Sequence, residues 1–396
     1  MPALWIELGC EEIPARWVAA LAQQMAERIA AGLREARLLA AEAQPEVRWT
    51  PRRLVARFAD VPARQPGRVE ELIGPPAAIA FAADGSVTPQ GAGFAAKCGL
   101  PANALYRTRT AKGEYAALKR ESRGEPAVAV LAERLPHWIT GMDLPKAMRW
   151  DCGGFKFVRP VRWWSVLLDA EVVAARLGGL TAGRATRPHP TLGGPNGGAV
   201  LDLADAAAAE PTLARDFVVL DPGERRRRIL AGLEAALAGT GLRARPDAAL
   251  LELLVNLTEW PAVVAGAFAP AFLQLPAEVL VTVMRDHQKY FAVEEADGAA
   301  PGTAALAPRF LAVMDLDADR EGLVRHGHER VLRARFKDAE FFWQADRKRS
   351  LASRAEDLRA VTFHARLGSY YDKTVRVIRL ARLLAAETEA APAAAA

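Results

Sequence analysis

Residues 4–10 read Leu-Trp-Ile-Glu-Leu-Gly-Cys, and this stretch decides how the chain begins to fold. Leu4, Ile6 and Leu8 alternate with other residue types, and a period of two residues is typical of a strand that packs on one face. The stretch after Pro14 predicts a helix, because apolar residues there recur at steps of three and four. These residues are Val18, Leu21, Met25, Ile29 and Leu33.

A second alternating run, residues 54–58, extends this opening into a small α/β unit of residues 1–65. Residues 66–320 mix short apolar runs with glycines and prolines, which predicts a mixed α/β region. Helical periodicity returns over residues 321–385, where we predict a long helix from His328 to about Leu358 and another from about Lys373 to Ala386. The Ala-rich tail at residues 386–396 is predicted to be disordered. We therefore predict an α+β fold that ends in a helical segment.

The composition is that of a globular protein, since 51% of the 396 residues are hydrophobic and 25% are charged. The net charge of +5 is too small to identify a nucleic-acid partner unless the charges are locally concentrated. Three widely spaced cysteines predict neither disulfides nor a zinc site and fit a reducing cytoplasm. The start lacks the basic region of a signal peptide, and the longest apolar stretch, residues 261–277, contains three prolines. We therefore expect no membrane partner.

Motifs of a self-contained catalytic site are absent from the sequence. Residues 91–96 match the letters of a dinucleotide-binding loop, but no strand precedes them, so we predict a loop that leads into a short helix. The sequence contains no phosphate-binding Walker loop, zinc-protease motif or serine-hydrolase elbow. His326 and His328 suggest metal ligands, yet no third or fourth ligand follows at a suitable spacing. We predict no catalytic and no metal-binding residue.

One candidate contact segment is residues 286–291, which read Asp-His-Gln-Lys-Tyr-Phe. His287 and Lys289 could reach a phosphate or a 2′-hydroxyl, and the two aromatic rings could stack on a base. The same composition also fits a strand end whose aromatic rings are core and whose polar side chains are solvated. The sequence leaves both interpretations open.

A second candidate segment is the basic stretch of residues 327–343. On a helix, Arg330, Arg333 and Lys337 fall within one arc, and an apolar line falls on another. Residues 320–350 hold nine Lys or Arg and five Asp or Glu, a net charge of +4. Such a patch suits a phosphate backbone, although a solvated helix face has the same pattern. The apolar line consists of Leu332, Phe336, Ala339 and Trp343.

Three other clusters have competing interpretations. Residues 225–228 are four arginines in the first turns of a predicted helix, where positive charge opposes the helix dipole, and we interpret them as a solvated face. Residues 145–150 and 157–163 alternate cations with aromatic rings, as RNA-binding surfaces and the edges of cores both do. Residues 259–261, Glu-Trp-Pro, are interpreted as structural, because a tryptophan is more often a packing anchor.

Further short motifs occur in order along the chain. They are Glu7-Leu8-Gly9-Cys10-Glu11-Glu12-Ile13-Pro14, Thr50-Pro51-Arg52-Arg53-Leu54, Met148-Arg149-Trp150, Phe157-Val158-Arg159-Pro160-Val161, Glu259-Trp260-Pro261, His287-Gln288-Lys289-Tyr290-Phe291, Glu329-Arg330-Val331, Asp338-Ala339-Glu340-Phe341-Phe342, and Leu367-Gly368-Ser369 with Asp372-Lys373. Taken together, this series resembles the β subunit of the bacterial heterotetrameric glycyl-tRNA synthetase.

The resemblance implies a division of labour. In that family the α subunit carries the class II catalytic core, which uses ATP with magnesium, and the β subunit supplies most of the tRNA grip in an α2β2 assembly. We therefore expect no cofactor in this chain and expect the α subunit, tRNA(Gly) and a second β subunit as partners. The resemblance also implies that residues 66–320 are similar to the B3/B4 module of the phenylalanyl-tRNA synthetase β chain.

Two departures from the family accompany the resemblance. The family's Arg-Gly-His-Arg-Phe segment appears here as Arg187-Pro188-His189-Pro190-Thr191, so the family does not define the role of this loop. Family members also continue into an HD-like helical domain and an anticodon-binding domain. We therefore expect residues 321–385 to lead towards the HD-like domain and the chain to be a truncated β subunit.

We predict that this chain binds tRNA(Gly) and the α subunit and so supports ATP-dependent attachment of glycine to tRNA(Gly). An alternative is an assembly scaffold that holds the α subunit without contacting RNA. A third hypothesis, an editing-like hydrolase, is disfavoured because no nucleophile with an adjacent base stands out. The predicted tRNA contacts are His287, Gln288, Lys289, Arg330, Arg333 and Lys337.

Overall fold

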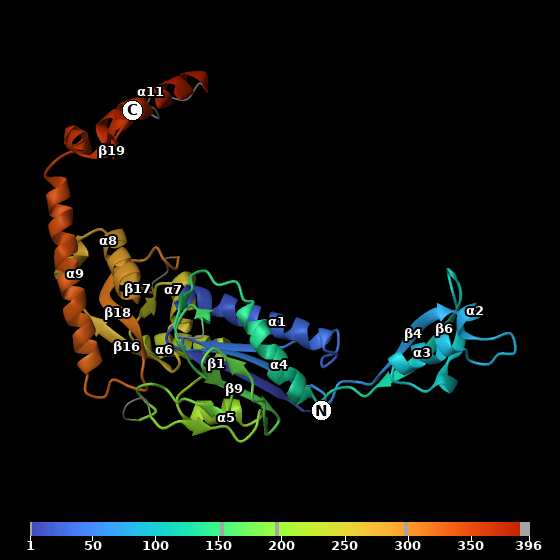
Figure 1. Ribbon diagram of the computed structural model, residues 1–396. Coiled ribbons are helices and arrows are strands. Elements are labelled where there is room, and N and C mark those ends of the chain that lie inside the picture. The colour runs from blue at the N-terminus through green and yellow to red at the C-terminus, as the bar shows by residue number, and fades with distance from the viewer. Residues whose placement is uncertain (1, 151–153, 195–197, 297–299, 389–396) are drawn as a thin grey trace. The chain divides into compact units, whose positions relative to one another are not determined.

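The computed structural model describes residues 2–150, 154–194, 198–296 and 300–388, and it confirms the predicted α+β fold (Figure 1). Most of the tail predicted at residues 386–396 lies outside the described residues. Within them, no helix is both long enough and apolar enough to cross a membrane. The chain divides into two compact units, of which unit 1 comprises Met1–Ala236, Asp247–Val263 and Val313–Asp319, and unit 2 comprises Leu237–Pro246, Val264–Ala312 and Arg320–Ala396.

Unit 1 contains a five-stranded antiparallel sheet with the order β10-β9-β1-β3-β2. In its middle strand β1, Leu4 lies opposite Phe58 of β3 on one side and opposite Leu168 of β9 on the other. The predicted strands at residues 4–8 and 54–58 are confirmed, and the sheet takes strands from both sides of residue 65. The five strands are β1 (Leu4–Cys10), β2 (Glu46–Thr50), β3 (Arg53–Phe58), β9 (Val161–Leu168) and β10 (Glu171–Val172).

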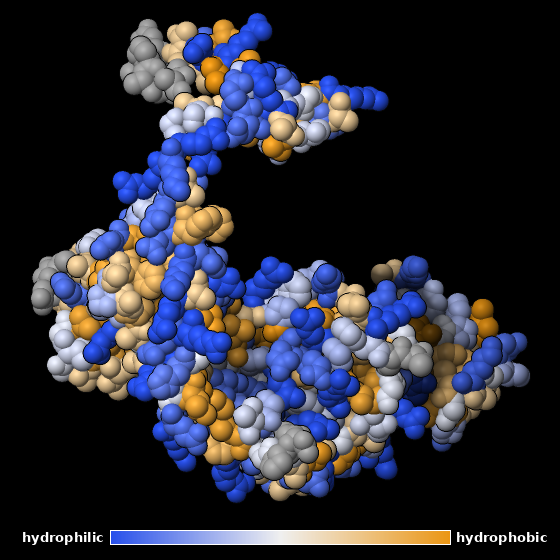
Figure 2. Space-filling view, turned by 90° about the vertical axis from the view of Figure 1, so that its left-hand side faces the viewer, coloured by the Kyte–Doolittle hydropathy of each residue, from blue (hydrophilic) through white to orange (hydrophobic). Residues whose placement is uncertain are grey.

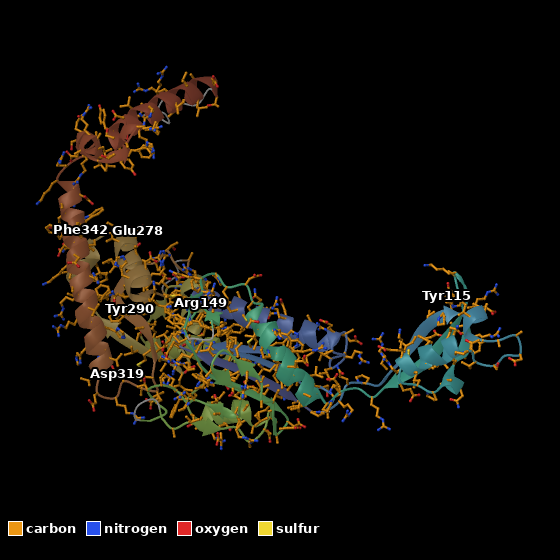
Figure 3. All side chains as sticks on the ribbon, viewed as in Figure 1. Tyr115, Arg149, Glu278, Tyr290, Asp319 and Phe342 are labelled. Atoms are coloured by element: carbon orange, nitrogen blue, oxygen red, sulfur yellow. The ribbon has the colours of Figure 1, made fainter. Side chains whose placement is uncertain are left out.

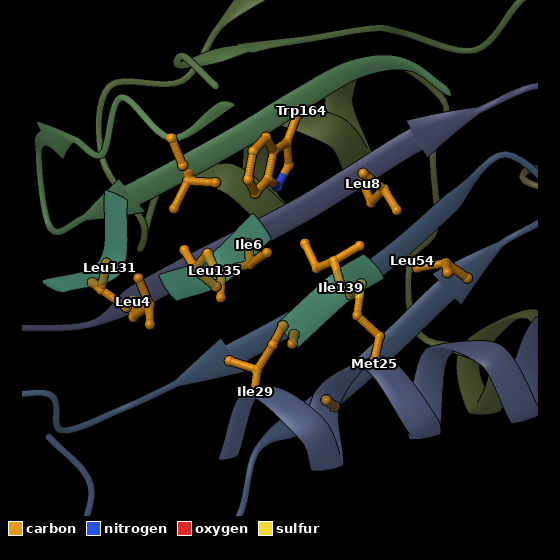
Figure 4. Packing of buried hydrophobic residues seen from close by; sticks show 14 of the residues in the cluster. Leu4, Ile6, Leu8, Met25, Ile29, Leu54, Leu131, Leu135, Ile139 and Trp164 are labelled. Atoms are coloured by element: carbon orange, nitrogen blue, oxygen red, sulfur yellow. The ribbon is translucent and has the colours of Figure 1, made fainter. Parts of the chain in front are cut away.

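Two helices, α1 (Ala15–Glu35) and α4 (Ala127–Thr140), cover one face of this sheet (Figures 1 and 4). The apolar line predicted for the first helix is buried against the leucines and isoleucine of β1. Each fully buried aliphatic side chain contributes about 1.5–3 kcal/mol, so this layer is a major source of stability. On the opposite face, Trp5 packs with Leu213 of α5 (Ala209–Arg215).

A smaller sheet in unit 1, with the order β4-β6-β5, shares a core with α2 and α3. The Thr88 hydroxyl accepts a hydrogen bond from the amide of Gly91 and caps α3. The predicted short helix is present, but the prediction that residues 91–96 form a loop before it is wrong, because the cap at Thr88 starts α3 before residue 91. The other elements up to residue 255 are β4 (Arg68–Pro76), α2 (Ala77–Ala80), α3 (Pro89–Lys97), η1 (Ala102–Ala104), β5 (Tyr106–Thr110), β6 (Gly113–Ser122), β7 (Met148–Arg149), β8 (Lys156–Phe157), β11 (Arg176–Leu177), β12 (Leu180–Thr181), β13 (Ala185–Thr186), β14 (Leu201–Asp202), α6 (Pro222–Leu237), β15 (Leu242–Ala244) and α7 (Ala248–Val255).

Unit 2 contains a sheet with the order β15-β17-β18-β16 and the long helix α9 (Leu323–Arg347). α9 begins and ends earlier than the helix predicted over residues 328–358. It ends earlier because Ser350 adopts an extended backbone and caps a separate short helix. The helix predicted from Lys373 to Ala386 is confirmed as α11 (Tyr370–Glu387), which a capping box opens. The other elements are β16 (Pro261–Ala267), η3 (Pro270–Gln274), α8 (Ala277–Thr282), η4 (Val283–Gln288), β17 (Tyr290–Glu295), β18 (Leu306–Asp315), α10 (Leu351–Arg354), η5 (Glu356–Ala360), β19 (Thr362–His364) and β20 (Gly368–Ser369).

Gly9 in β1 leaves space for a tryptophan ring on the neighbouring strand. Trp163 of β9 is its cross-strand partner, and a β-carbon added to Gly9 would lie 1.8 Å from Cε2 of the indole. The ring is held in place because its Nε1 donates a hydrogen bond to Oε1 of Glu7 at 2.7 Å. Any side chain at position 9 must therefore displace the ring or distort the strand.

We expect Gly9→Ala to lower the free energy of unfolding by about 1–3 kcal/mol, because overpacking in a buried sheet has no easy relief. Gly93→Ala in α3 is the control, since the added carbon would meet no atom within 4 Å other than those of its own stretch of helix. The control should gain about 0.5–1 kcal/mol from the better helix propensity of alanine. Urea unfolding measures both changes, and a Gly9→Ala variant as stable as the wild type would contradict the packing argument.

Candidate nucleic-acid interface

An ion cluster is buried in unit 1 where distant sequence motifs meet. Arg53 lies between the carboxylates of Glu7 and Glu259, and all three side chains are almost fully buried. Nε of Arg53 donates to Oε1 of Glu7 at 3.2 Å, and Nη1 donates to Oε1 of Glu259. Nη2 donates to the main-chain carbonyl of Arg187. One guanidinium thus joins β3 to β1 and to the turn before β16, which lie 46 and 206 residues away in sequence.

Two neutral donors also contact this ion cluster. The Thr186 hydroxyl donates to Oε1 of Glu7 at 2.6 Å, and the Thr50 hydroxyl donates to Oε1 of Glu259 at 2.6 Å. These hydrogen bonds compensate the carboxylates for the water that they lose on burial. Because its members are buried, the ion cluster holds strands together and is not a surface for a ligand. The expectation that Glu259-Trp260-Pro261 is structural fits this arrangement.

We expect Arg53→Met to lower the free energy of unfolding by about 3–5 kcal/mol, because it leaves two carboxylates buried without their cation. Arg57→Met on the same strand is the matched control, since Arg57 pairs with Glu46 at 3.1 Å where both side chains are partly exposed. The control should change stability by less than about 1 kcal/mol. Equal losses for the two variants in denaturant unfolding would show that the ion cluster has no special role.

The loop that departs from the family motif, residues 187–191, is packed beside the ion cluster. His189 is buried, its Nδ1 accepts hydrogen bonds from the amides of Thr191 at 3.2 Å and Leu192 at 3.1 Å, and its Nε2 lies 3.2 Å from Oδ2 of Asp315. The carbonyl of Arg187 accepts a hydrogen bond from the buried arginine described above. In this structure the loop therefore has a structural role.

The arginines of residues 225–228 are not all on a solvated face, which corrects the sequence interpretation. Arg225 is fully buried and donates to the carbonyls of residues 219, 220 and 255, and burial lowers its pKa to about 10. Arg226 pairs with Glu252, and the other two arginines pair with Glu224. The burial of Arg225 could not be predicted from the sequence. Its partners are main-chain carbonyls of neighbouring turns, and main-chain groups leave no pattern of residue types. The cations of α6 are thus matched within the chain.

Three features of the described residues disfavour a hydrolytic site. Burial raises the pKa of the Cys10 thiol well above its usual range, which disfavours the nucleophilic thiolate. A surface depression in unit 1 is lined by Trp5, Arg57 and Glu210, among others, and contains no nucleophile beside a base. Within the described residues, no group of three or more His, Cys, Asp or Glu side chains could hold a metal ion.

The first predicted contact segment forms a π-helical turn. η4 continues directly from α8, and Lys289 then adopts the left-handed conformation with φ of 63° and reverses the chain into β17. His287 is exposed, whereas Gln288 and Lys289 are half-buried. Nζ of Lys289 donates to the carbonyl of Asp286 at 2.6 Å. π-turns and strained non-glycine residues are frequent at functional sites, so the segment remains a candidate.

Tyr290 joins this segment to α9 (Figure 3). Its hydroxyl lies 2.6 Å from Nδ1 of His328, and the two rings meet edge to face with centroids 5.1 Å apart. It also stacks on Phe310 with a centroid distance of 4.7 Å. Tyr290 and Phe291 are each 3% exposed. Of the two interpretations that the sequence left open, the structure therefore selects core packing for both aromatic rings.

Burial raises the pKa of Tyr290 to about 12, from an unfolded value near 10. The neutral phenol therefore contributes stability that is fully present below pH 10 and is lost as the pH rises towards 12. Between pH 10 and 11 we expect the wild type to lose about 1 kcal/mol more than Tyr290→Phe in urea unfolding. Parallel stability curves for the two proteins over this range would contradict the assigned burial.

The buried side of α9 carries Leu332 and Phe336. The ring of Phe336 contacts Phe268 at 4.9 Å and Phe272 at 5.4 Å between centroids. This packing fixes which side of the helix is left for solvent. The apolar line predicted from the sequence is confirmed at these two positions, and Trp343 farther along it is partly exposed.

The opposite side of α9 carries a stripe of exposed cations, which we name the basic stripe: Arg330, Arg333, Lys337 and Lys348. At about 100° per residue, all four lie within about 60° of Arg330 on the helix, whereas the four acidic residues of α9 lie about 80° or more away. No described residue forms an ion pair with these cations. Figure 2 shows the side of the molecule on which α9 lies in Figure 1, and the helix is largely hydrophilic there.

The first predicted contact segment, residues 286–291, contacts a different side of α9 from the one that carries the basic stripe. η4 packs against α9, and Tyr290, which follows η4 in the chain, contacts His328 of α9. His328 lies about 160° around the helix from Arg330, so the basic stripe faces away from the contact with Tyr290. Lys348 is not among the contacts predicted from the sequence, although a helical wheel continued five residues beyond residue 343 places it at the same angle as Arg330.

Comparison with known proteins defines the family. The family model described as glycyl-tRNA synthetase beta subunit matches residues 4–396. The chain is 43% identical over 392 residues to the glycine–tRNA ligase beta subunit of Acidobacterium capsulatum, which covers 98% of this chain and 54% of the relative. It is 40% identical over 392 residues to that of Oleidesulfovibrio alaskensis, with 98% and 54% coverage, and 36% identical over 389 residues to that of Desulfatibacillum aliphaticivorans, with 98% and 55% coverage.

The chain therefore belongs to the glycyl-tRNA synthetase beta subunit family. It spans about half the length of the curated relatives that it matches. The family resemblance inferred from the sequence motifs is thereby confirmed.

Proposed function

We propose that this chain binds tRNA(Gly) for a glycine–tRNA ligase, with the basic stripe of α9 as the principal contact to the phosphate backbone. Family membership supports the substrate. The observation that carries the choice of surface is that Arg330, Arg333 and Lys337 are exposed and have no carboxylate partner among the described residues. Unmatched cations on one helix face attract a polyanion, whereas cations paired within the chain do not.

The proposal assigns the activation chemistry to a separate α subunit. That subunit would use ATP with magnesium to activate glycine, and this chain would hold no cofactor. The assembly would be α2β2 in the cytoplasm, with the β subunits orienting tRNA towards the α active sites. Under this proposal His287, Gln288 and Lys289 form a second, smaller contact, because they end the π-helical turn at the surface of unit 2.

We expect the double variant Arg330→Ala/Arg333→Ala to bind a tRNA(Gly) transcript on the order of 10-fold more weakly at low salt. The slope of log affinity against log salt concentration should become shallower by about 1–2, because each lost cation no longer displaces a counterion. Fluorescence titration of the full chain at several salt concentrations measures both quantities.

The matched control is Arg226→Ala/Arg227→Ala on α6, which removes the same charge from two partly exposed arginines that are already paired with Glu252 and Glu224. We expect its salt slope to remain close to that of the wild type. If both double variants change the slope equally, RNA binding depends on net charge rather than on the basic stripe.

A second candidate function, an assembly scaffold for the α subunit, is favoured by the apolar surface of α11. No residue of α11 is buried, and Leu380 and Leu384 are 59% and 61% exposed. Exposed apolar side chains of this kind commonly mark protein contacts. Under this alternative the α subunit would co-purify with the chain while salt-dependent affinity for tRNA would be absent.

A further inference from the structure

We propose that Phe341 of α9 is a stacking platform for an unpaired nucleobase of the RNA that lies along the basic stripe. This inference rests on the proposed function and adds a recognition element that is not electrostatic. The side chain of Phe341 is 66% exposed. Every nucleobase offers a flat face on which an exposed aromatic ring can stack.

The position of Phe341 on the helix places it within the basic stripe. It lies one turn beyond Lys337 and about 20° around the helix from Arg330. Lys348 lies two turns farther on, at the same angle as Arg330. Cations therefore occur on both sides of the ring along the helix axis. A strand whose phosphates contact these cations would pass directly over Phe341.

The adjacent residue Phe342 provides an internal comparison. It is 63% exposed, nearly as much as Phe341, and the two rings meet edge to face with centroids 5.5 Å apart. Phe342 lies about 120° from Arg330, however, and Asp338 and Asp346 lie one turn before and one turn after it. Asp338 pairs with Arg335 and Asp346 pairs with Arg354, so the cations beside Phe342 are already matched by carboxylates. Phe341 and Phe342 are similarly exposed, but only Phe341 lies among the cations of the basic stripe, which can bind phosphates.

The local charges favour RNA over a protein partner for Phe341. The arc of α9 within about 60° of Arg330 contains cations, His326, Gln344, the exposed Leu323 at the start of the helix, and small or aromatic residues, but no acidic residue. A protein docking site of similar size commonly has a charge-depleted centre. Stacking beside a row of phosphate-binding cations is instead the arrangement used for single-stranded nucleic acid.

The test compares Phe341→Ala, Phe341→Leu and Phe342→Ala in the full chain, with a single-stranded RNA oligonucleotide and its duplex as probes. We expect both Phe341 variants to bind the single strand about 5- to 100-fold more weakly, because leucine retains apolar area but cannot stack. The salt slope should stay unchanged, since no charge is removed. Affinity for the duplex and the binding of Phe342→Ala should match the wild type.

Two results would overturn the inference. One is an equal effect of the Phe341 and Phe342 variants, and the other is full affinity of Phe341→Leu, which would indicate that apolar contact with a protein is the role of this side chain. Failure of the proposed function is distinguishable, because the Arg330→Ala/Arg333→Ala variant would then also leave RNA affinity and its salt slope unchanged. Circular dichroism confirms that each variant remains folded.

Discussion

The buried guanidinium of Arg53 is the constraint on which the architecture of unit 1 depends. Moving two carboxylates and one guanidinium out of water costs several kcal/mol for each ion, so these groups are stable inside the protein only in an arrangement that pairs them. Glu7, Arg53 and Glu259 are in such an arrangement. This requirement fixes β1 against β3 and fixes both strands against a turn 206 residues farther along the chain.

The ion cluster also indicates where function is not located. Several polar residues in the most distinctive sequence motifs, such as Glu7, Thr50 and Glu259, are directed inward and form hydrogen bonds within the buried ion cluster. The arginines of α6 and those of α9 also differ in whether they are matched within the chain. On α6, one arginine is buried and the others pair with glutamates, whereas the basic stripe of α9 has no such partners among the described residues. Charge that is not matched within the chain is available to a partner.

The sequence predicted what depends on local periodicity. Alternation identified β1 and β3, and the spacing of apolar residues identified α1, α11 and the buried side of α9. It could not reveal that Glu259 neutralises Arg53, because a contact between residues 206 apart leaves no local pattern. The same limit explains Arg225, whose partners are main-chain carbonyls, and Tyr290, whose burial depends on His328 in a later helix. The candidate tRNA contacts on α9 were found because they share one helix face, but their lack of partners required the structure.

The most direct measurement of the central claim is a cross-linking map of bound tRNA. Full-length tRNA(Gly) that contains photoreactive uridines is irradiated in complex with the whole chain, and the cross-linked peptides are identified by mass spectrometry. If the basic stripe binds the RNA, peptides from residues 326–348 will dominate the map. Cross-links that avoid this segment and concentrate on a surface with internally paired charges, such as the arginines of α6, would contradict the account.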